Sequence, residues 1–240
     1  PFAINATAFQ APPSPQFPLG TDSVGRDVLS RLIYGSRVSL SVGIVAVSIY
    51  VSIGTVLGAI SGYYRGWVDH TIMRLADVVL SFPSFLLILV LVSVVGASIW
   101  NIMVVIGLLG WPPVCRIVRG QFLSLREREF VEAARCLGVR NLRIVFRHIL
   151  PNTIGPILVA ATFGAAVAIL TESALSFLGL GVQPPEASWG SLLTDAQSLT
   201  TLERMPWLWL PPGLLILVSV LAINFVGDGL RDAFDPRLVA

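Results

Sequence analysis

Residues 132–152 read EAARCLGVRNLRIVFRHILPN, a short segment rich in arginine between long apolar stretches. Gly138 supplies a left-handed stop for a first helix. Asn141 can cap a second helix, which ends at Pro151. The apolar positions of this second helix recur at the spacing of one helix face: Leu142, Val145, Phe146 and Ile149. The segment predicts two short helices joined at a glycine, which form a docking surface rather than a catalytic site.

The composition places the chain among membrane proteins. Of its 240 residues, 55% are hydrophobic and only 12% are charged. A helix needs roughly 20 apolar residues to cross a bilayer core. Stretches without charge therefore predict five spans, at about residues 38–62, 78–95, 99–118, 154–178 and 207–226.

The arginines predict the orientation of these spans. All 16 basic residues are arginine, and twelve of them fall on one side of the predicted spans, against four on the other. Because basic residues concentrate in cytoplasmic loops, segment 132–152 and the C-terminus are predicted to be cytoplasmic. The N-terminal arm and residues 179–206 then lie outside. An outside N-terminus without a signal peptide predicts that a further span precedes this chain.

Several classes of function are not supported by the residues present. A phosphate-binding Walker loop requires a lysine, and the chain has none, so any ATP that drives its work must be hydrolysed by a partner. The net charge of +2 and the lack of a basic stripe with aromatic residues argue against nucleic acid. The few candidate metal ligands are scattered: His70, His148, Cys115 and Cys136. We expect no catalytic residue, no metal site and no cofactor bound by this chain.

Segment 132–152 resembles the EAA loop of ABC importer permeases. The matching residues are Glu132, Ala133, Ala134, Gly138, Leu150 and Pro151. Segments 18–40, 172–190 and 224–238 extend the resemblance to the C-type permease subunit of dipeptide, oligopeptide and nickel ABC importers. The similarity covers residues 18–240, with the motifs in order. Ordinary positive-inside topology would explain the arginines of the loop, but not its EAA…G…LP spacing.

The resemblance implies an all-α integral membrane fold of the type I importer class, with five of six spans present in this chain. It divides the chain into an extracytoplasmic arm (1–35), a permease domain (36–226) and a cytoplasmic tail (227–240). The permease domain includes a coupling loop (121–151) and an outer loop (179–206). The implied location is the inner membrane of a bacterium.

The resemblance also implies partners and roles. The expected partners are a homologous second permease, two cytoplasmic ABC ATPase subunits that bind ATP and Mg, an extracytoplasmic peptide-binding protein or lipoprotein, and membrane lipid. The chain would form half of a pathway for short peptides. Residues expected to couple it to the ATPases are Glu132, Ala133, Ala134, Arg135, Leu137, Gly138, Leu150 and Pro151. Nickel chelates and glutathione remain alternative cargoes, and an ion-driven secondary transporter is the alternative of another class.

Glu172 is the one carboxylate well inside a predicted span, near its outer boundary, and such residues are candidates for function. It could line the translocation path, tie its span to a neighbouring arginine, or reach interfacial water. Asp77 is expected to sit as a charge at the N-terminal end of a span. Gly54, Gly58 and Gly62 follow the spacing of a helix-packing face.

Overall fold

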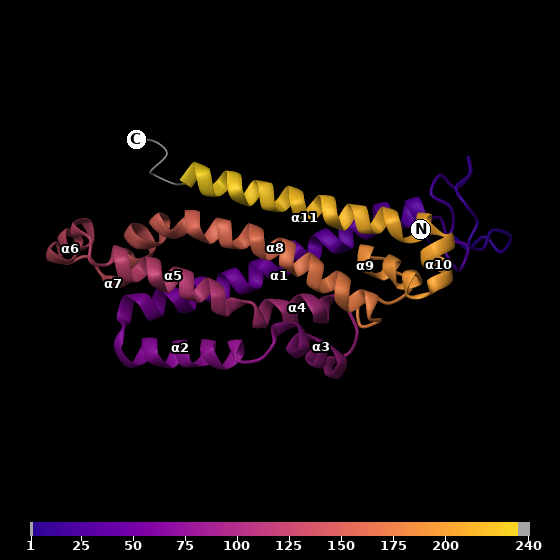
Figure 1. The fold of residues 1–240 in the computed structure, drawn as a ribbon. Coiled ribbons are helices and arrows are strands. Elements are labelled where there is room, and N and C mark those ends of the chain that lie inside the picture. Colours follow the sequence, from indigo (N-terminus) through magenta and orange to yellow (C-terminus); the bar gives the residue numbers. More distant parts are fainter. Residues whose placement is uncertain (1, 235–240) are drawn as a thin grey trace.

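The longest helix, α1 (Val28–Tyr64), forms the axis of the molecule in the computed structural model, which describes residues 2–234. Its 37 residues correspond to about 55 Å. The helix begins at Asp27, whose carboxylate accepts a hydrogen bond from the Ser30 backbone N–H at 2.9 Å. It ends at Arg65, where φ is 59°. Figure 1 shows α4 (Ile99–Leu109), α5 (Trp111–Leu125) and α8 (Ile154–Phe177) packed along α1, whereas α11 (Pro206–Phe234) packs mainly on α8.

Every regular element of residues 2–234 is a helix. The α-helices after α1 are α2 (Gly66–Leu80), α3 (Ser84–Val95), α4 (Ile99–Leu109), α5 (Trp111–Leu125), α6 (Glu129–Cys136), α7 (Asn141–Arg143), α8 (Ile154–Phe177), α9 (Trp189–Leu192), α10 (Leu199–Arg204) and α11 (Pro206–Phe234). A π-helical turn (Ile144–Ile149) and a 3-10 turn (Leu150–Thr153) link α7 to α8. A second 3-10 turn, Leu193–Gln197, follows α9.

Four helical stretches are long and apolar enough to cross a membrane: α1, Ile99–Leu125, Asn141–Phe177 and α11. The pair α2 and α3 passes the same test only when taken together, and the two helices are bent by 82°. The described chain therefore has four candidate spans, or five with the bent pair. The larger number equals the five spans predicted from sequence.

The span predicted over residues 78–95 is not one continuous helix. Helix α2 ends at Leu80 and α3 starts at Ser84, so a break divides the charge-free stretch. Pro83 lies in the break, where its ring removes a backbone donor and disfavours helical geometry in the preceding residue. Asp77 consequently lies near the end of α2, not at the start of a span. Its Oδ1 pairs with Arg116 Nη2 of α5 at 2.6 Å.

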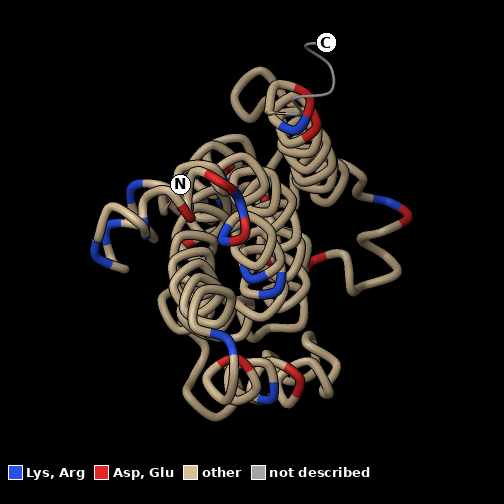
Figure 2. Tube along the Cα trace, turned by 90° about the vertical axis from the view of Figure 1, so that its left-hand side faces the viewer, with Lys and Arg blue, Asp and Glu red and all other residues tan. Residues whose placement is uncertain are grey.

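The two ends of the bundle carry different structures (Figure 1). One end, here called the hairpin end, carries α6, α7 and the C-terminal part of α11. The other, the arm end, carries the N-terminal arm with α9 and α10. Figure 2 looks onto the hairpin end and shows the basic and acidic positions distributed over it. Asp235 and Arg237 of the predicted tail lie outside the described residues.

Glycines bring α1 and α5 into close contact, as their spacing predicts. A Cβ added to Gly54 would lie 2.7 Å from Val114 Cβ, and one added to Gly62 would lie 2.6 Å from Phe122 Cβ. At Gly58 the added atom would lie 2.6 Å from the carbonyl oxygen of Cys115. Such distances leave no room for a side chain, so this glycine face sets the separation of the two helices.

We expect Gly58→Leu to destabilise the protein by about 1–3 kcal/mol, because the new side chain must push against α5 backbone. Thermal unfolding of the purified protein in detergent measures the effect. Gly120→Leu, on α5 itself, is the matched control, since an added Cβ there meets nothing within 4 Å. Equal melting temperatures for the two variants would contradict the packing role of Gly58.

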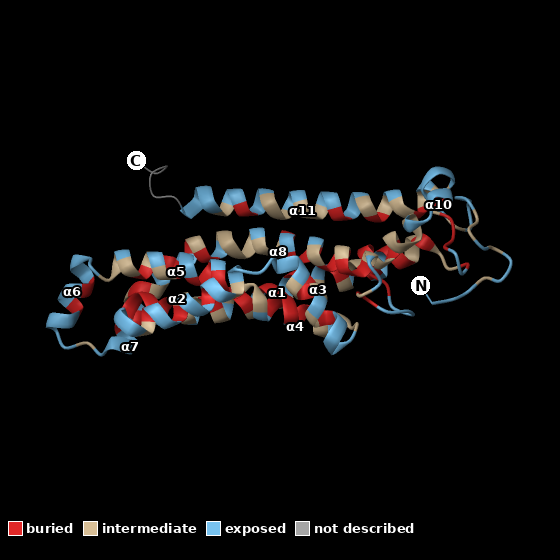
Figure 3. Ribbon diagram, turned by 60° about the horizontal axis from the view of Figure 1, so that its bottom comes forward, coloured by how far each residue is buried: buried red, intermediate tan, exposed pale blue. Residues whose placement is uncertain are grey.

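Burial is uneven across the bundle. Figure 3 shows α1 and α4 rich in buried positions, whereas α11 is exposed along most of its length. The buried residues of α11 are Leu208, Pro212, Ile216 and Gly227. Because α11 is apolar as well as exposed, its outer surface suits contact with lipid or another membrane helix.

Candidate functional site

The segment selected from the sequence forms a hairpin at one end of the bundle. Helix α6 is followed by Gly138, whose φ of 72° confirms the predicted left-handed stop. The N–H of Gly138 donates to the carbonyl of Arg135 at 2.9 Å, and that of Val139 donates to the carbonyl of Ala134 at 3.1 Å. These bonds satisfy carbonyls at the helix end and turn the chain back. The hairpin, residues 129–150, thus has a fixed bend.

The second helix of the hairpin differs from the prediction. Arg140, not Asn141, is its N-cap, and α7 passes into the π-helical turn after three residues. Ile144 and Ile149, five residues apart, are both fully buried, whereas Leu142 and Phe146 are exposed. The i→i+5 hydrogen bonding of a π turn widens the helix, so Ile144 is buried beside Val145 and Ile149 of the predicted face, while Leu142 and Phe146 are not.

Pro151 does not end this helix. It occupies an early position of the 3-10 turn that leads into α8, where a missing N–H is tolerated. The hairpin is therefore continuous with a membrane-spanning helix. Asn141–Phe177 forms one helical stretch with changes of pitch. Leu150 is half-buried at this junction, and Pro151 is exposed.

Helix α6 has two apolar faces. Val131 is fully buried and Ala134 is 6% exposed, and both belong to the core that also contains Phe122 of α5. Phe130, Ala133 and Leu137 lie on another face, with Phe130 42% and Leu137 83% exposed. We call these three residues the outward stripe. Their spacing of three and four residues places them on one side of the helix.

Ala134, one of the residues expected to couple the chain to a partner, is buried in the structure. Its side chain packs inward, so it cannot present itself to a partner at this position. Of the other residues predicted to couple, Leu150 is half-buried, and the rest are exposed: Glu132, Ala133, Arg135, Leu137, Gly138 and Pro151. An added Cβ at Gly138 would meet nothing within 4 Å, so its positive φ, not lack of space, accounts for the glycine.

Tyr63, in the last turn of α1, holds the hairpin. Its hydroxyl donates to Asn141 Oδ1 at 2.8 Å, and its backbone carbonyl accepts from Arg126 Nη1 at 2.6 Å. The guanidinium of Arg135 lies 5.8 Å from the centre of its ring. Tyr63 therefore touches the segments before, within and after α6. Sequence reasoning missed this residue, because all three contacts join positions more than 60 residues apart.

Two ion pairs fasten α2 to α5 on the same half of the bundle. Arg119 binds Asp69 with Nε at 2.5 Å from Oδ1 and Nη2 at 2.6 Å from Oδ2. The hydroxyl of Ser61 on α1 also donates to Asp69. The Arg116–Asp77 pair adds a second connection. Forked arginine–carboxylate pairs fix orientation as well as distance, so α1, α2 and α5 are held in a defined arrangement.

A cavity of about 1130 Å³ lies beside these helices. Its wall is mostly apolar and comes from α1, α3, α5, α8 and α11, and from the ends of α2 and α4. The polar residues that line it are Tyr50, Ser84, Gln121, Asn152, Thr171 and Arg231. A mostly apolar wall with a few separated polar groups suits a ligand of mixed character.

Glu172 is not among the residues that line this cavity. It is fully buried, and its Oε1 accepts from Ser176 Oγ at 2.6 Å. Its neighbour Thr171 faces the cavity instead. Neither an arginine partner nor exposure to solvent is found for Glu172 in the described part of the chain, which differs from two of the three sequence-based expectations.

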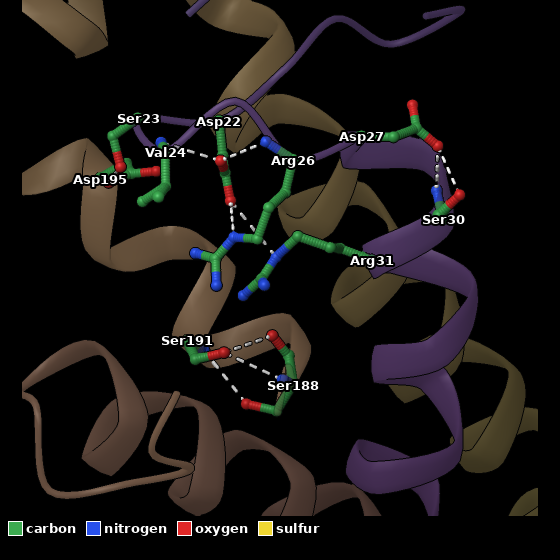
Figure 4. Close-up of polar contacts among 10 residues, drawn as sticks. All are labelled: Asp22, Ser23, Val24, Arg26, Asp27, Ser30, Arg31, Ser188, Ser191 and Asp195. Atoms are coloured by element: carbon green, nitrogen blue, oxygen red, sulfur yellow. Dashed lines mark hydrogen bonds and ion pairs between the residues drawn. The ribbon is translucent and has the colours of Figure 1, made fainter. Parts of the chain in front are cut away.

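A cluster of polar contacts lies at the arm end, between the N-terminal arm, the start of α1 and the segment that contains Asp195 (Figure 4). Asp22 pairs with Arg26 at 2.8 Å and lies 3.5 Å from Nε of the buried Arg31. Ser23 donates to Asp195 of the outer loop at 3.2 Å. Burial raises the pKa of Asp195 above its usual value. These contacts tie the arm to both α1 and the outer loop.

Residues 54–240 match the family described as the binding-protein-dependent transport system inner membrane component. A dipeptide transport system permease protein of Alkalihalophilus pseudofirmus is 46% identical over 94% of this chain and 74% of its own length. A glutathione transport system permease protein of Pectobacterium atrosepticum is 43% identical over the same shares.

The fold also has a solved counterpart. A chain of the MetNI methionine ABC transporter in an inward-facing conformation matches with a TM-score of 0.70. The match covers 86% of this chain and 97% of the other at 17% identity. This likeness concerns the fold alone.

Proposed function

The chain belongs to the family of binding-protein-dependent transport system inner membrane components, the permease subunits of type I ABC importers, and we propose that it forms half of an import pathway for short peptides. The family membership favours ATP-driven import over an ion-driven secondary transporter. ATP and Mg would be bound by separate ATPase subunits, because this sequence lacks the lysine of a Walker loop.

The observation that carries this proposal is the outward stripe on a hairpin that is bound to α1 through the contacts of Tyr63. An apolar face that residues 2–234 leave exposed at the end of the bundle suits a protein partner. Tyr63 and the continuous stretch into α8 connect this face to two long helices. A partner that moves the hairpin would thereby move α1 and α8.

The proposed mechanism is a shift between two arrangements of the helices. The ATPase subunits bind the hairpin and change their own separation with ATP. Coupling requires that the hairpin contacts differ between the inward-open and outward-open arrangements. The fixed bend at Gly138 makes the hairpin a rigid lever for this motion.

The cavity is the proposed half of the peptide pathway. A homologous second permease would supply the opposite wall. The separated polar groups can bind peptide backbone without selecting one side chain, while the apolar wall accepts varied residues. An extracytoplasmic binding protein would then deliver the cargo at the arm end and largely determine its identity.

The orientation is tested by cysteine labelling in intact cells. After replacement of the exposed Cys136 by serine, we expect Arg140→Cys to react only when reagent reaches the cytoplasm. Glu186→Cys, in the exposed part of the outer loop, should react with impermeant reagent added outside. The arginine distribution is the reason for this expectation. Reversed labelling would contradict the proposed orientation.

The cargo is tested by competition for uptake in proteoliposomes that contain the complete importer and its binding protein. We expect dipeptides and short oligopeptides with different side chains to reduce uptake of a labelled dipeptide, because backbone and termini are the shared features. Glutathione and a nickel chelate serve as the comparison compounds. If only one of these two competes, the peptide assignment is wrong and the family assignment stands.

A further inference from the structure

Glu172 lies at the meeting point of α1, α8 and the outer loop. It is fully buried and forms no ion pair within residues 2–234. A buried carboxylate without a cation needs several hydrogen-bond donors in compensation. Those donors come from serine hydroxyls, and each of the serines involved is itself bonded to the backbone of the outer loop.

Two hydrogen-bond chains converge on the carboxylate. In the first, the Trp189 N–H donates to Ser39 Oγ at 3.0 Å, and Ser39 Oγ lies 3.5 Å from Glu172 Oε2. In the second, the Val182 N–H donates to Ser176 Oγ at 3.3 Å, and Ser176 Oγ donates to Oε1 at 2.6 Å. Each serine thus accepts from the loop backbone and donates to the carboxylate, which fixes the direction of both chains.

A branch extends the second chain. The Ser191 N–H donates to Ser188 Oγ at 3.1 Å, and Ser188 Oγ donates to Ser176 Oγ at 3.4 Å. Figure 4 shows Ser188 and Ser191 beside one another at the start of α9. Three backbone N–H groups of the outer loop are therefore oriented, through hydroxyl groups, by one acidic side chain.

The backbones approach closely around this network. A Cβ added to Gly190 would lie 2.5 Å from Ser173 Cα, and one added to Gly35 would lie 3.3 Å from the Ser188 carbonyl carbon. The indole N–H of Trp189 also donates to the carbonyl of Leu32 at 3.2 Å. The loop is thus seated directly on α1 and α8, with the carboxylate beneath it.

We propose that Glu172 is a positioning residue that holds residues 179–192 of the outer loop against α1 and α8, so that this loop moves together with the two helices linked to the hairpin. Glu172 acts through Ser39 and Ser176 and not by contact with cargo in the cavity. The ordered loop presents one surface at the arm end, where the proposed function places the binding protein.

Backbone hydrogen–deuterium exchange of the assembled importer tests the positioning directly, without reliance on transport. Loss of the shared acceptor in Glu172→Ala should accelerate exchange of peptides covering residues 179–192 about tenfold. Glu203→Gln, which removes an exposed carboxylate from α10 of the same loop, is the control and should leave that exchange unchanged.

Single-serine variants separate positioning from general destabilisation, and they remain informative if Glu172→Ala does not fold. Ser39→Ala should accelerate exchange at Trp189 more than at Val182, whereas Ser176→Ala should do the reverse. Unchanged exchange in all three variants would overturn the proposal. So would an acceleration that is equal across the bundle, including α5.

A kinetic measurement extends the test, and this part rests on the proposed function. Glu172→Ala should raise the binding-protein concentration that half-maximally stimulates ATP hydrolysis, with a smaller change in the maximal rate. Glu172→Asp should restore part of the loss, because it retains the acceptor. A fall in the maximal rate alone, with no change in the half-maximal concentration, would contradict a role in loop positioning.

Discussion

Ala133→Trp is expected to reduce strongly the stimulation of ATP hydrolysis by the binding protein while leaving the permease folded and inserted. Ala133 lies in the centre of the outward stripe, where a large side chain would hold a docked surface away. Coupling between sites is commonly worth 1–3 kcal/mol, so its loss should reduce stimulated hydrolysis about tenfold or more. The measurement is ATPase activity of the reconstituted importer with and without loaded binding protein.

Ala134→Trp is the matched comparison, because it places the same side chain one residue later on the inward face. Ala134 packs against the core, so the indole should destabilise the hairpin by about 1–3 kcal/mol and lower the melting temperature. Ala133→Trp should leave the melting temperature near that of the parent. If both variants kept stimulated hydrolysis, the outward stripe would not be the coupling surface. If both lowered the melting temperature equally, the assigned faces would be wrong.

Tyr63→Ala is the second change with a large expected effect. It removes the ring of a residue that is 7% exposed, the hydrogen bond to Asn141 and the contact with Arg135. Truncation of a buried aromatic residue costs about 3–5 kcal/mol. Because these contacts join α1 to the hairpin, movement of the hairpin should no longer be passed to α1, although the helix bundle stays folded. We expect transport to be lost and exchange of residues 129–150 to increase.

Tyr63→Phe gives the graded comparison. It keeps the ring and loses only the hydroxyl bond, which is worth about 1 kcal/mol. Most transport should therefore remain. Val56→Ala, an exposed position on the same helix, controls for substitution in α1 as such. Equal loss of transport in Tyr63→Phe and Tyr63→Ala would show that the packing of the ring does not transmit motion.

The sequence was sufficient for features that depend on local patterns. Charge-free stretches located the apolar helices, because burial in lipid excludes charge over a continuous length. The glycine at 138 indicated the turn, since few other residues adopt positive φ. The spacing of Gly54, Gly58 and Gly62 indicated a packing face, and the contacts with α5 confirm it.

The sequence-based predictions of helix ends and of the exposed face of α6 were wrong where two local sequence signals pointed to different structures. The break at Pro83 was hidden by the absence of charge around it, although a proline after an apolar run is itself a signal for a helix end. At Pro151 a helix end was predicted where the structure has none, because proline is compatible with the first turn of a helix. The inward orientation of Ala134 was not evident, since α6 has apolar residues on two faces.

The features that could not be predicted depend on contacts distant in sequence. Tyr63 meets Asn141, and Ser39 meets Glu172 and Trp189, across more than 75 residues in each case. Nothing in a single sequence pairs these positions. A carboxylate in an apolar stretch indicated an unusual environment, but its serine partners became apparent only in the fold.

Cross-linking from Cys136 tests the central claim most directly. This native thiol is exposed at the end of α6, one residue from Leu137 of the outward stripe, whereas Cys115 is buried and should not react. A photoreactive group attached to Cys136 in the reconstituted importer should capture the ATPase subunit, with a yield that changes when ATP is added. Capture of lipid or of the second permease alone, with no ATPase adduct in any nucleotide state, would contradict the hairpin as the coupling surface.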